Sequence, residues 1–183
     1  MIKKVKVIAL LSLVVLMFSC QEEETWIPKP TGYMKRSFPE RNYITYQDTM
    51  CPYSFEVVDY ANVLSVNGGG GCHKDIEFLN FNCELNLSYL PVDSNLFGLT
   101  EYVQQKMKEH TSIAKAITPI KYVDEERKMY GMYYRLDGDV ALNGIVLLTD
   151  STNHFLSGKL TFNVAPNYDS LKPSIDYVTE DIH

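Results

Sequence analysis

The chain has little positive charge and no apolar run long enough to cross a bilayer. Lys and Arg number 17 in 183 residues, against 23 Asp and Glu. Nucleic-acid binding needs a basic face toward the phosphates, so this balance argues against it. The apolar run over residues 7–18 falls well short of the ~20 residues that a membrane-spanning helix needs.

The motifs of common catalytic sites are missing too. No Gly-x-Ser-x-Gly elbow occurs, and the four glycines at 68–71 lack the Gly-Lys-Ser/Thr of a phosphate-binding loop, so they predict a flexible hairpin loop. Asp137, Asp139 and Asp150 could mimic paired carboxylates, but they lie in predicted turns and are better explained as turn formers. We therefore expect no catalytic residues, no cofactor and no enzymatic activity.

The N-terminus has the pattern of a secretory signal. Three lysines precede the apolar run, and Ser19-Cys20 follow it. The end of this stretch, residues 17–20 (MFSC), resembles a bacterial lipobox, in which Cys20 is lipidated and becomes the first mature residue. The alternative is an ordinary cleaved signal followed by a coincidental cysteine. We expect a lipoprotein signal peptide over residues 1–19 and an anchor at Cys20.

An acidic and proline-rich tether is predicted over residues 20–31, before a single domain over 32–183. Removal of the signal leaves 14 basic and 23 acidic residues, a net charge near −9. The acidic run 21–24 should be repelled by anionic headgroups and stand off the membrane. It also resembles the acidic tag that sends some lipoproteins of gliding-type bacteria to the cell surface, although a solvated linker explains it equally well.

The sequence pattern centres on a predicted β-hairpin. Two β-forming runs, 145–149 and 154–164, flank residues 150–153 (DSTN), whose side chains favour tight turns. The first run is continuously apolar and suits a strand buried on both faces. In the second run, Gly158 permits a bulge. We expect this hairpin at the centre of an antiparallel sheet.

Further strands are predicted on both sides of the hairpin. Strict alternation of apolar and polar residues over 79–89 indicates a strand with one solvent-exposed face, either continuous or broken near Asn80. β-forming residues predict the other strands, at 53–66, 120–123, 128–136 and from 140 into the hairpin.

Two segments change to a helical period. Over residues 96–118 apolar residues recur every three or four positions, which predicts an amphipathic helix capped by Asn95 and ended by Pro119. A second amphipathic helix is predicted to start at Asp169 or Ser170. One antiparallel sheet packed with two helices belongs to the α+β class.

Several segments together resemble the gliding motility lipoprotein family GldD. The most specific segment is 148–156 (LTDSTNHFL), and the others are 28–33 (PKPTGY), 38–39 (FP), 51–56 (CPYSFE), 87–89 (LSY), 162–163 (FN), 166–167 (PN) and 169–171 (DSL). Gly131 and Tyr134 also fall where the family has a Tyr-Gly…Tyr pattern. The sequence departs from the family at the glycines 68–71 and at Cys83.

This resemblance implies an envelope lipoprotein that is required for surface gliding and linked to the associated type IX secretion system. It implies no known enzymatic activity and no established ligand. The predicted order of strands, helix, meander and helix is also similar to a PsbP-like α/β/α sandwich. Similarity of fold alone does not assign a function.

The resemblance also bears on the three cysteines that follow Cys20. Cys51 and Cys72 correspond to the family's cysteines, and a disulfide between them would close a ~20-residue loop worth about 3 kcal/mol in an oxidising periplasm. Cys83 lies on an apolar face and is expected to be a buried free thiol. A metal site that used Cys51, Cys72 and His73 lacks any supporting ligand spacing, so we expect no metal.

Three short segments match an O-glycosylation acceptor pattern of bacteria that carry this family. They centre on Thr49, Ser151 and Ser170, each of which follows an aspartate. Each segment lies near a predicted turn or element end, where a glycan can be accommodated.

Our principal hypothesis is a lipid-anchored, non-enzymatic accessory component of the gliding and type IX secretion apparatus. It would act through contacts with other envelope proteins, from the periplasmic face of a membrane or from the cell surface. The alternative is a lipid-anchored carrier of a small lipid or glycan, because a sheet covered by helices can hold an apolar pocket. An envelope hydrolase, a third hypothesis, would need a deep cleft with coupled titratable groups.

Overall fold

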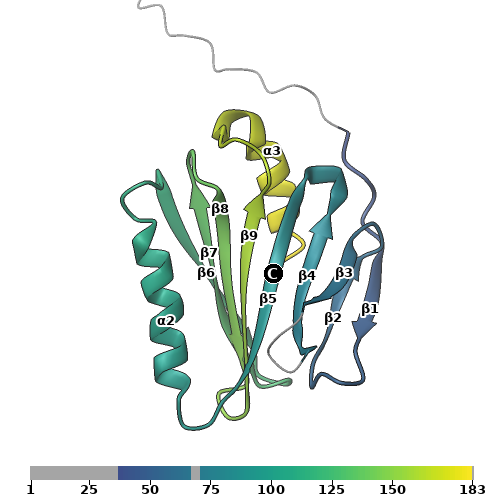
Figure 1. Ribbon diagram of the computed structural model, residues 1–183, viewed down its shortest axis with the longest axis vertical. Coiled ribbons are helices and arrows are strands. Elements are labelled where there is room, and N and C mark those ends of the chain that lie inside the picture. The colour runs from purple at the N-terminus through teal and green to yellow at the C-terminus, as the bar shows by residue number, and fades with distance from the viewer. Residues whose placement is uncertain (1–36, 67–70, 183) are drawn as a thin grey trace, which may run out of the picture. The chain divides into compact units, whose positions relative to one another are not determined.

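The computed structural model describes residues 37–66 and 71–182, all of which belong to one compact unit. Within these residues no helix is both long and apolar enough to span a bilayer. The described elements (Figure 1) are β1 (Tyr43–Gln47), β2 (Ser54–Val58), β3 (Asn62–Val66), β4 (His73–Phe78), the 3-10 helix η2 (Leu79–Phe81), β5 (Cys83–Pro91), α2 (Leu96–Glu109), β6 (Ala116–Asp124), β7 (Met129–Asp137), β8 (Leu142–Thr149), β9 (His154–Phe162) and α3 (Tyr168–Thr179).

A seven-stranded sheet carries the fold, in the strand order β3-β4-β5-β9-β8-β7-β6. Every neighbouring pair is antiparallel. The β8–β9 hairpin lies in the middle of this order, and the first six residues of β8 are buried. The prediction of a central antiparallel hairpin with a buried first strand is therefore confirmed.

The bulge in this hairpin is on the other strand from the one predicted. The register shifts in β8, between Leu142 and Gly144, and β9 runs regularly through Gly158. At Gly158 an added Cβ would lie 2.7 Å from the Val146 side chain and 2.9 Å from that of Leu87. Glycine is therefore needed at this position because neighbouring side chains approach the backbone closely.

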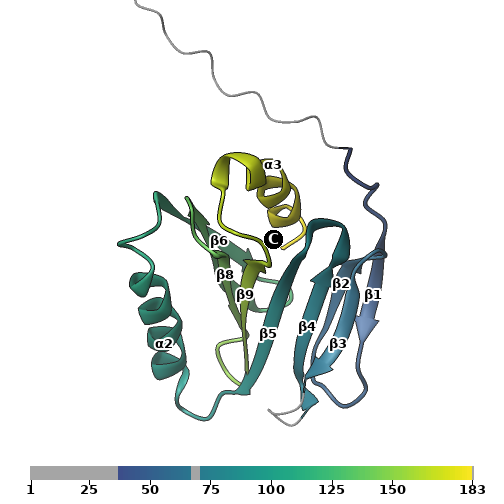
Figure 2. The same cartoon turned by 45° about the horizontal axis from the view of Figure 1, so that its top comes forward.

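The two helices pack on opposite faces of the sheet, and Figure 2 shows β8 and β9 between them. On one face, α3 contributes Ile175 and Val178 to a core that also includes residues of β2. On the other face, α2 packs through Val103 against Ile145 and its neighbours. Successive residues of a strand point to opposite faces, so β8 supplies both cores. The predicted α+β class, with two helices on an antiparallel sheet, is confirmed.

Two predicted strands differ from the structure. Residues 53–66 form two strands rather than one, since β2 pairs with β1 in a separate two-stranded sheet and β3 begins the large sheet. A turn at residues 59–61 separates them, with the Ala61 N–H donating to the Val58 carbonyl. The segment 79–89 begins as η2, and the strand proper starts at Cys83. The alternative of a break near Asn80 is therefore the one that occurs.

The helix predicted over 96–118 is shorter than expected. It ends at Glu109, and residues 116–124 form the edge strand β6. Pro119 lies within that strand, where an edge position tolerates its missing N–H. Asn95 stands at the N-cap position, but its side chain accepts a hydrogen bond from Asp93 N–H rather than from the helix.

Helix α3 starts slightly earlier than predicted. Its cap is Asn167, whose side-chain oxygen accepts a hydrogen bond from Ser170 N–H at 3.3 Å. Asp169 instead lies in the first turn, where a negative charge favours the helix dipole. The predicted apolar stripe is present, because Ile175 and Val178 are fully buried.

Candidate functional site

The described chain begins with a segment that is held against the C-terminal end of α3. Phe38 stacks on Tyr177 with ring centroids 4.6 Å apart. The Arg41 guanidinium lies 4.0 Å from the Tyr177 ring and pairs with Glu180 at 2.7 Å and Asp181 at 2.8 Å. We call these five residues the clasp. Through Phe38 and Arg41, the clasp holds the first described residues of the chain against the residues at the end of α3.

Asp181 links the clasp to the β1–β2 hairpin. Its carboxylate accepts hydrogen bonds from the hydroxyls of Tyr43, at 2.8 Å, and Tyr60. Its side chain is only 3% exposed. Burial, and then the hydrogen bond to Asp181, raise the pKa of Tyr43. The end of α3 therefore holds both the incoming segment and the strand that follows it.

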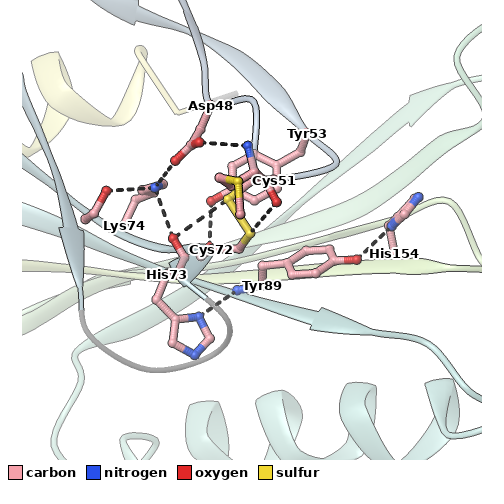
Figure 3. Close-up of a disulfide and its surroundings, with 11 residues drawn as sticks. Asp48, Cys51, Tyr53, Cys72, His73, Lys74, Tyr89 and His154 are labelled. Carbon is pink, nitrogen blue, oxygen red and sulfur yellow. Dashed lines mark hydrogen bonds and ion pairs between the residues drawn. A yellow bond between two sulfur atoms is a disulfide. The ribbon is translucent and has the colours of Figure 1, made fainter.

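A disulfide ties the β1–β2 hairpin to the large sheet (Figure 3). It joins Cys51, in the loop after β1, to Cys72, directly before β4, with Cα atoms 5.4 Å apart. Both cysteines are buried, and the Tyr53 hydroxyl donates to the Cys72 carbonyl at 2.6 Å. Cys83 is a buried free thiol, and burial raises its pKa to about 12. The structure therefore contains the expected pairing and leaves the expected thiol free.

Beside the disulfide lies a lysine whose side chain is fully buried. The Lys74 ammonium donates to the Asp48 carboxylate at 2.6 Å, to the Ser65 hydroxyl at 2.9 Å and to the Gly71 carbonyl at 3.1 Å. Burial alone would lower the pKa of Lys74, but the hydrogen bond to Asp48 and nearby tyrosines raise it on balance. The same hydrogen bond lowers the pKa of Asp48. This pair stays charged and holds the loop before Cys51 in place.

Sequence reasoning missed Lys74, and the signal for it was weak. The residue alternates with Ile76 and Phe78, which point into the core from the same strand. That alternation alone places Lys74 on the buried face. What makes its burial tolerable is a carboxylate 26 positions earlier in the chain, which no local pattern reveals.

Two histidines near the disulfide take part in hydrogen bonds. His154 Nδ1 lies 3.0 Å from the Tyr89 hydroxyl, and His73 Nδ1 accepts from Tyr89 N–H at 3.1 Å. Figure 3 shows the His73 ring directed away from the two sulfur atoms. Among the residues that the structure describes, no three potential metal ligands from His, Cys, Asp and Glu come together.

The three aspartates considered as paired carboxylates are engaged separately. Asp137 pairs with Arg135 at 2.8 Å, and Asp139 accepts from Tyr168 N–H at 2.7 Å. Asp150 lies at the other end of β8. The structure therefore places Asp150 apart from Asp137 and Asp139.

The candidate glycosylation residues are all exposed. Thr49 lies in the turn after β1, Ser151 in the β8–β9 turn and Ser170 in the first turn of α3. Ser151 adopts a left-handed backbone conformation, with φ at 66°. Cys20 lies outside the described residues.

The comparison with protein families gives a clear result. The model of the family described as gliding motility lipoprotein GldD matches residues 23–183. The chain belongs to the GldD family. Members of this family are lipoproteins, so the protein is an envelope protein attached to a membrane, and its family links it to gliding motility.

Other comparisons add less to the GldD assignment. No curated protein matches the chain. Among solved structures, the cyanobacterial PsbP (CyanoP) from Synechocystis sp. PCC 6803 matches with a TM-score of 0.46 and 15% sequence identity, over 81% of this chain and 95% of that one. A structural similarity at this level carries no information about what a GldD protein does.

Proposed function

We propose that this protein is a lipid-anchored, non-enzymatic accessory component of the gliding motility apparatus and of its associated type IX secretion, and that it acts through protein–protein contacts. The observation that carries the proposal is the family match over residues 23–183. The lipid is attached at Cys20, which follows the lipobox-like residues 17–19.

The arrangement at the N-terminal side of the domain supports an anchoring role. Sixteen residues separate Cys20 from Ser37, the first residue that the structure describes. Covalent geometry sets an upper limit of about 55 Å on the span of any chain of this length. The clasp, the disulfide and the Lys74–Asp48 pair then fix the first strands to the sheet. A domain held in this way can meet partner proteins while its anchor stays in the membrane.

Gene deletion with complementation tests the proposal. We expect the deletion strain to lose surface spreading and the export of adhesins, and the wild-type gene to restore both. A deletion strain that spreads and secretes normally would overturn the proposed function.

The anchor is tested separately with Cys20→Ala. We expect this variant to fractionate away from the membrane and to fail in complementation, because it carries no lipid. Cys83→Ala is the matched control, since it removes a buried thiol and leaves the N-terminus intact. Intact-mass analysis of the mature wild-type protein should show an acylated N-terminal cysteine. The same measurement on the full chain tests the proposed glycans at Thr49, Ser151 and Ser170.

A further inference from the structure

A groove lies on the face of the sheet that α3 covers, over strands β6, β7 and β8. The strand register places two rows of residues side by side in its floor, Ile120–Tyr133–Val146 and Tyr122–Gly131–Leu148. We call it the acidic groove. Its volume is about 370 Å³, and residues of these two rows line it together with Tyr43, Glu56, Met129, Glu180, Asp181 and Ile182.

The walls of the acidic groove come from distant parts of the chain. The β1–β2 hairpin contributes Tyr43 and Glu56, and the residues after α3 contribute Glu180, Asp181 and Ile182. Tyr43 is 48% exposed beside this apolar floor. Exposed aromatic side chains around a concave apolar surface are typical of protein interfaces.

The carboxylates at the groove outnumber the cationic side chains that pair with them. Glu180 and Asp181 share the Arg41 guanidinium within the clasp. Glu56, on the same hairpin face as Tyr43, forms no ion pair among the described residues. Lys121 borders the groove, but strand alternation directs its side chain toward the opposite face from Ile120 and Tyr122. The groove therefore presents an acidic rim with one carboxylate that lacks a cation.

The volume of the acidic groove suits side chains of a partner protein. An apolar cavity of ~150 Å³ holds one benzene-sized ring, so a groove of about 370 Å³ has room for two large apolar side chains. The flexible side chain of Met129 at its edge can adapt to different shapes. A cationic residue of the partner, next to its inserted apolar side chain, would meet Glu56 at the rim of the groove.

We propose that the acidic groove is the docking surface for an extended partner segment that inserts one or two large apolar side chains and carries a flanking lysine or arginine. The proposal rests on the proposed function, because it assigns a site to the protein–protein contacts. Charge complementarity favours this occupant: the acidic rim and the excess of acidic residues in the chain both attract a cationic segment.

A defined peptide probe tests the docking chemistry. The full lipidated chain is placed in phosphatidylcholine nanodiscs, and a labelled acetyl-Lys-Leu-Lys-Phe-Lys-amide is titrated against it, with its Glu-for-Lys twin as a control. We expect saturable binding of the cationic peptide, weakened by salt, and none of the acidic twin. A photoreactive leucine in the peptide should crosslink to groove residues. Equal binding of both peptides, or no binding at about 1 mM, overturns the proposal.

Two pairs of variants locate the binding. Glu56→Lys should weaken binding about tenfold by reversing the rim charge, whereas Glu101→Lys, on the exposed side of α2, should not. Ile120→Trp should fill the groove and abolish binding, whereas Val123→Trp on the opposite face of the same strand should not. Binding unchanged by both groove variants overturns the proposal. Native mass spectrometry that finds a lipid or glycan displaced by Ile120→Trp would also overturn it.

Experiments in cells separate this proposal from the proposed function. If the deletion strain loses gliding and the Glu56→Lys and Ile120→Trp variants, at normal protein levels, do not restore it, both proposals are supported. If these variants restore gliding fully, the groove proposal fails and the proposed function stands. If the deletion strain glides normally, the proposed function fails, whatever the peptide result.

Discussion

The turn of the central hairpin shows how far local sequence determines structure at the scale of single residues. One carboxylate oxygen of Asp150 accepts hydrogen bonds from the N–H groups of Thr152, Asn153 and His154, at 3.0, 2.8 and 2.8 Å. All its partners lie within four positions, which is why a pattern of Asp, Ser, Thr and Asn was enough to predict the turn.

The contribution of Asp150 to the stability of the fold should depend on pH. Partial burial alone would raise the pKa of Asp150, but the three N–H donors outweigh it and hold the pKa well below its usual value. Asp150 therefore stabilises the fold in full above about pH 5, and this stabilisation is lost as pH falls through and below ~4. In urea unfolding, Asp150→Ala should cost about 1–3 kcal/mol at pH 7 and less near ~pH 2.5, where part of this stabilisation has been lost.

The control for this prediction is Asp150→Asn, which keeps an acceptor oxygen and removes the charge. We expect a smaller loss that varies less with pH. A gap between wild type and Asp150→Ala that stays constant across the acid range would contradict the role assigned to the carboxylate.

Lys74 is the residue whose environment could not be predicted. Its ammonium is buried against Asp48, so removal of the carboxylate alone leaves an uncompensated charge. We expect Asp48→Ala to lower the urea midpoint clearly, and the double variant Asp48→Ala/Lys74→Met to recover part of the loss. Glu109→Ala, which removes the exposed pair with Lys106, should change the midpoint little. A double variant less stable than Asp48→Ala would argue against a buried charge as the cause.

At the scale of elements, pairing between strands determined where a helix ends, which hydrophobic periodicity alone did not show. Apolar residues at helical spacing continue through residues 113–117, yet the chain leaves the helix at Glu109. Ala116 pairs with Asp137, and Lys115 N–H donates to the Asp137 carbonyl at 2.7 Å. A strand partner some twenty positions away is not visible in a local window. The helix itself was predictable, and its end was not.

Two glycines in these elements should respond in opposite ways to alanine. Gly138 has φ at +125°, and an added Cβ would lie 2.8 Å from Lys115 N, so Gly138→Ala should cost about 2 kcal/mol or more. Gly98 lies in α2 with open space around it, so Gly98→Ala should stabilise by about 0.5–1 kcal/mol. Chemical denaturation of both variants checks this pair. If Gly138→Ala does not destabilise the fold, the strain assigned to residue 138 is wrong.

At the scale of the whole molecule, the sequence predicted the components of the fold better than their connections. The central hairpin, both helices and the α+β class were predictable from periodicity. The separation of β1 and β2 into a second sheet was not, because residues 53–66 contain β-forming residues throughout and only the turn at 59–61 divides them. The clasp could not be predicted for a similar reason. It joins residues about 140 positions apart, such as Arg41 and Asp181, and no local pattern reveals such a contact.

The disulfide is a covalent cross-link between the two sheets, in addition to the backbone that joins β2 to β3, and its removal tests how much it stabilises the molecule. Cys51 and Cys72 are 21 positions apart. Closure of a loop of this length restricts the unfolded chain and should stabilise the fold by about 3 kcal/mol. We expect the variant Cys51→Ser/Cys72→Ser to lose about this amount in urea unfolding, and wild type in reductant to approach the same midpoint. Cys83→Ala should keep its sensitivity to reductant.

Alkylation with iodoacetamide gives an independent count of the thiols in the same molecule. The native protein should take up no label, because Cys83 is buried, its pKa is raised to about 12, and the other two described cysteines are bonded. Unfolding without reductant should expose the Cys83 thiol alone, and reduction should add the thiols of Cys51 and Cys72. Because iodoacetamide reacts with the thiolate, fast labelling of the folded chain would mean that a thiol is exposed and ionised. Three labels before reduction would mean that Cys51 and Cys72 are not bonded to each other.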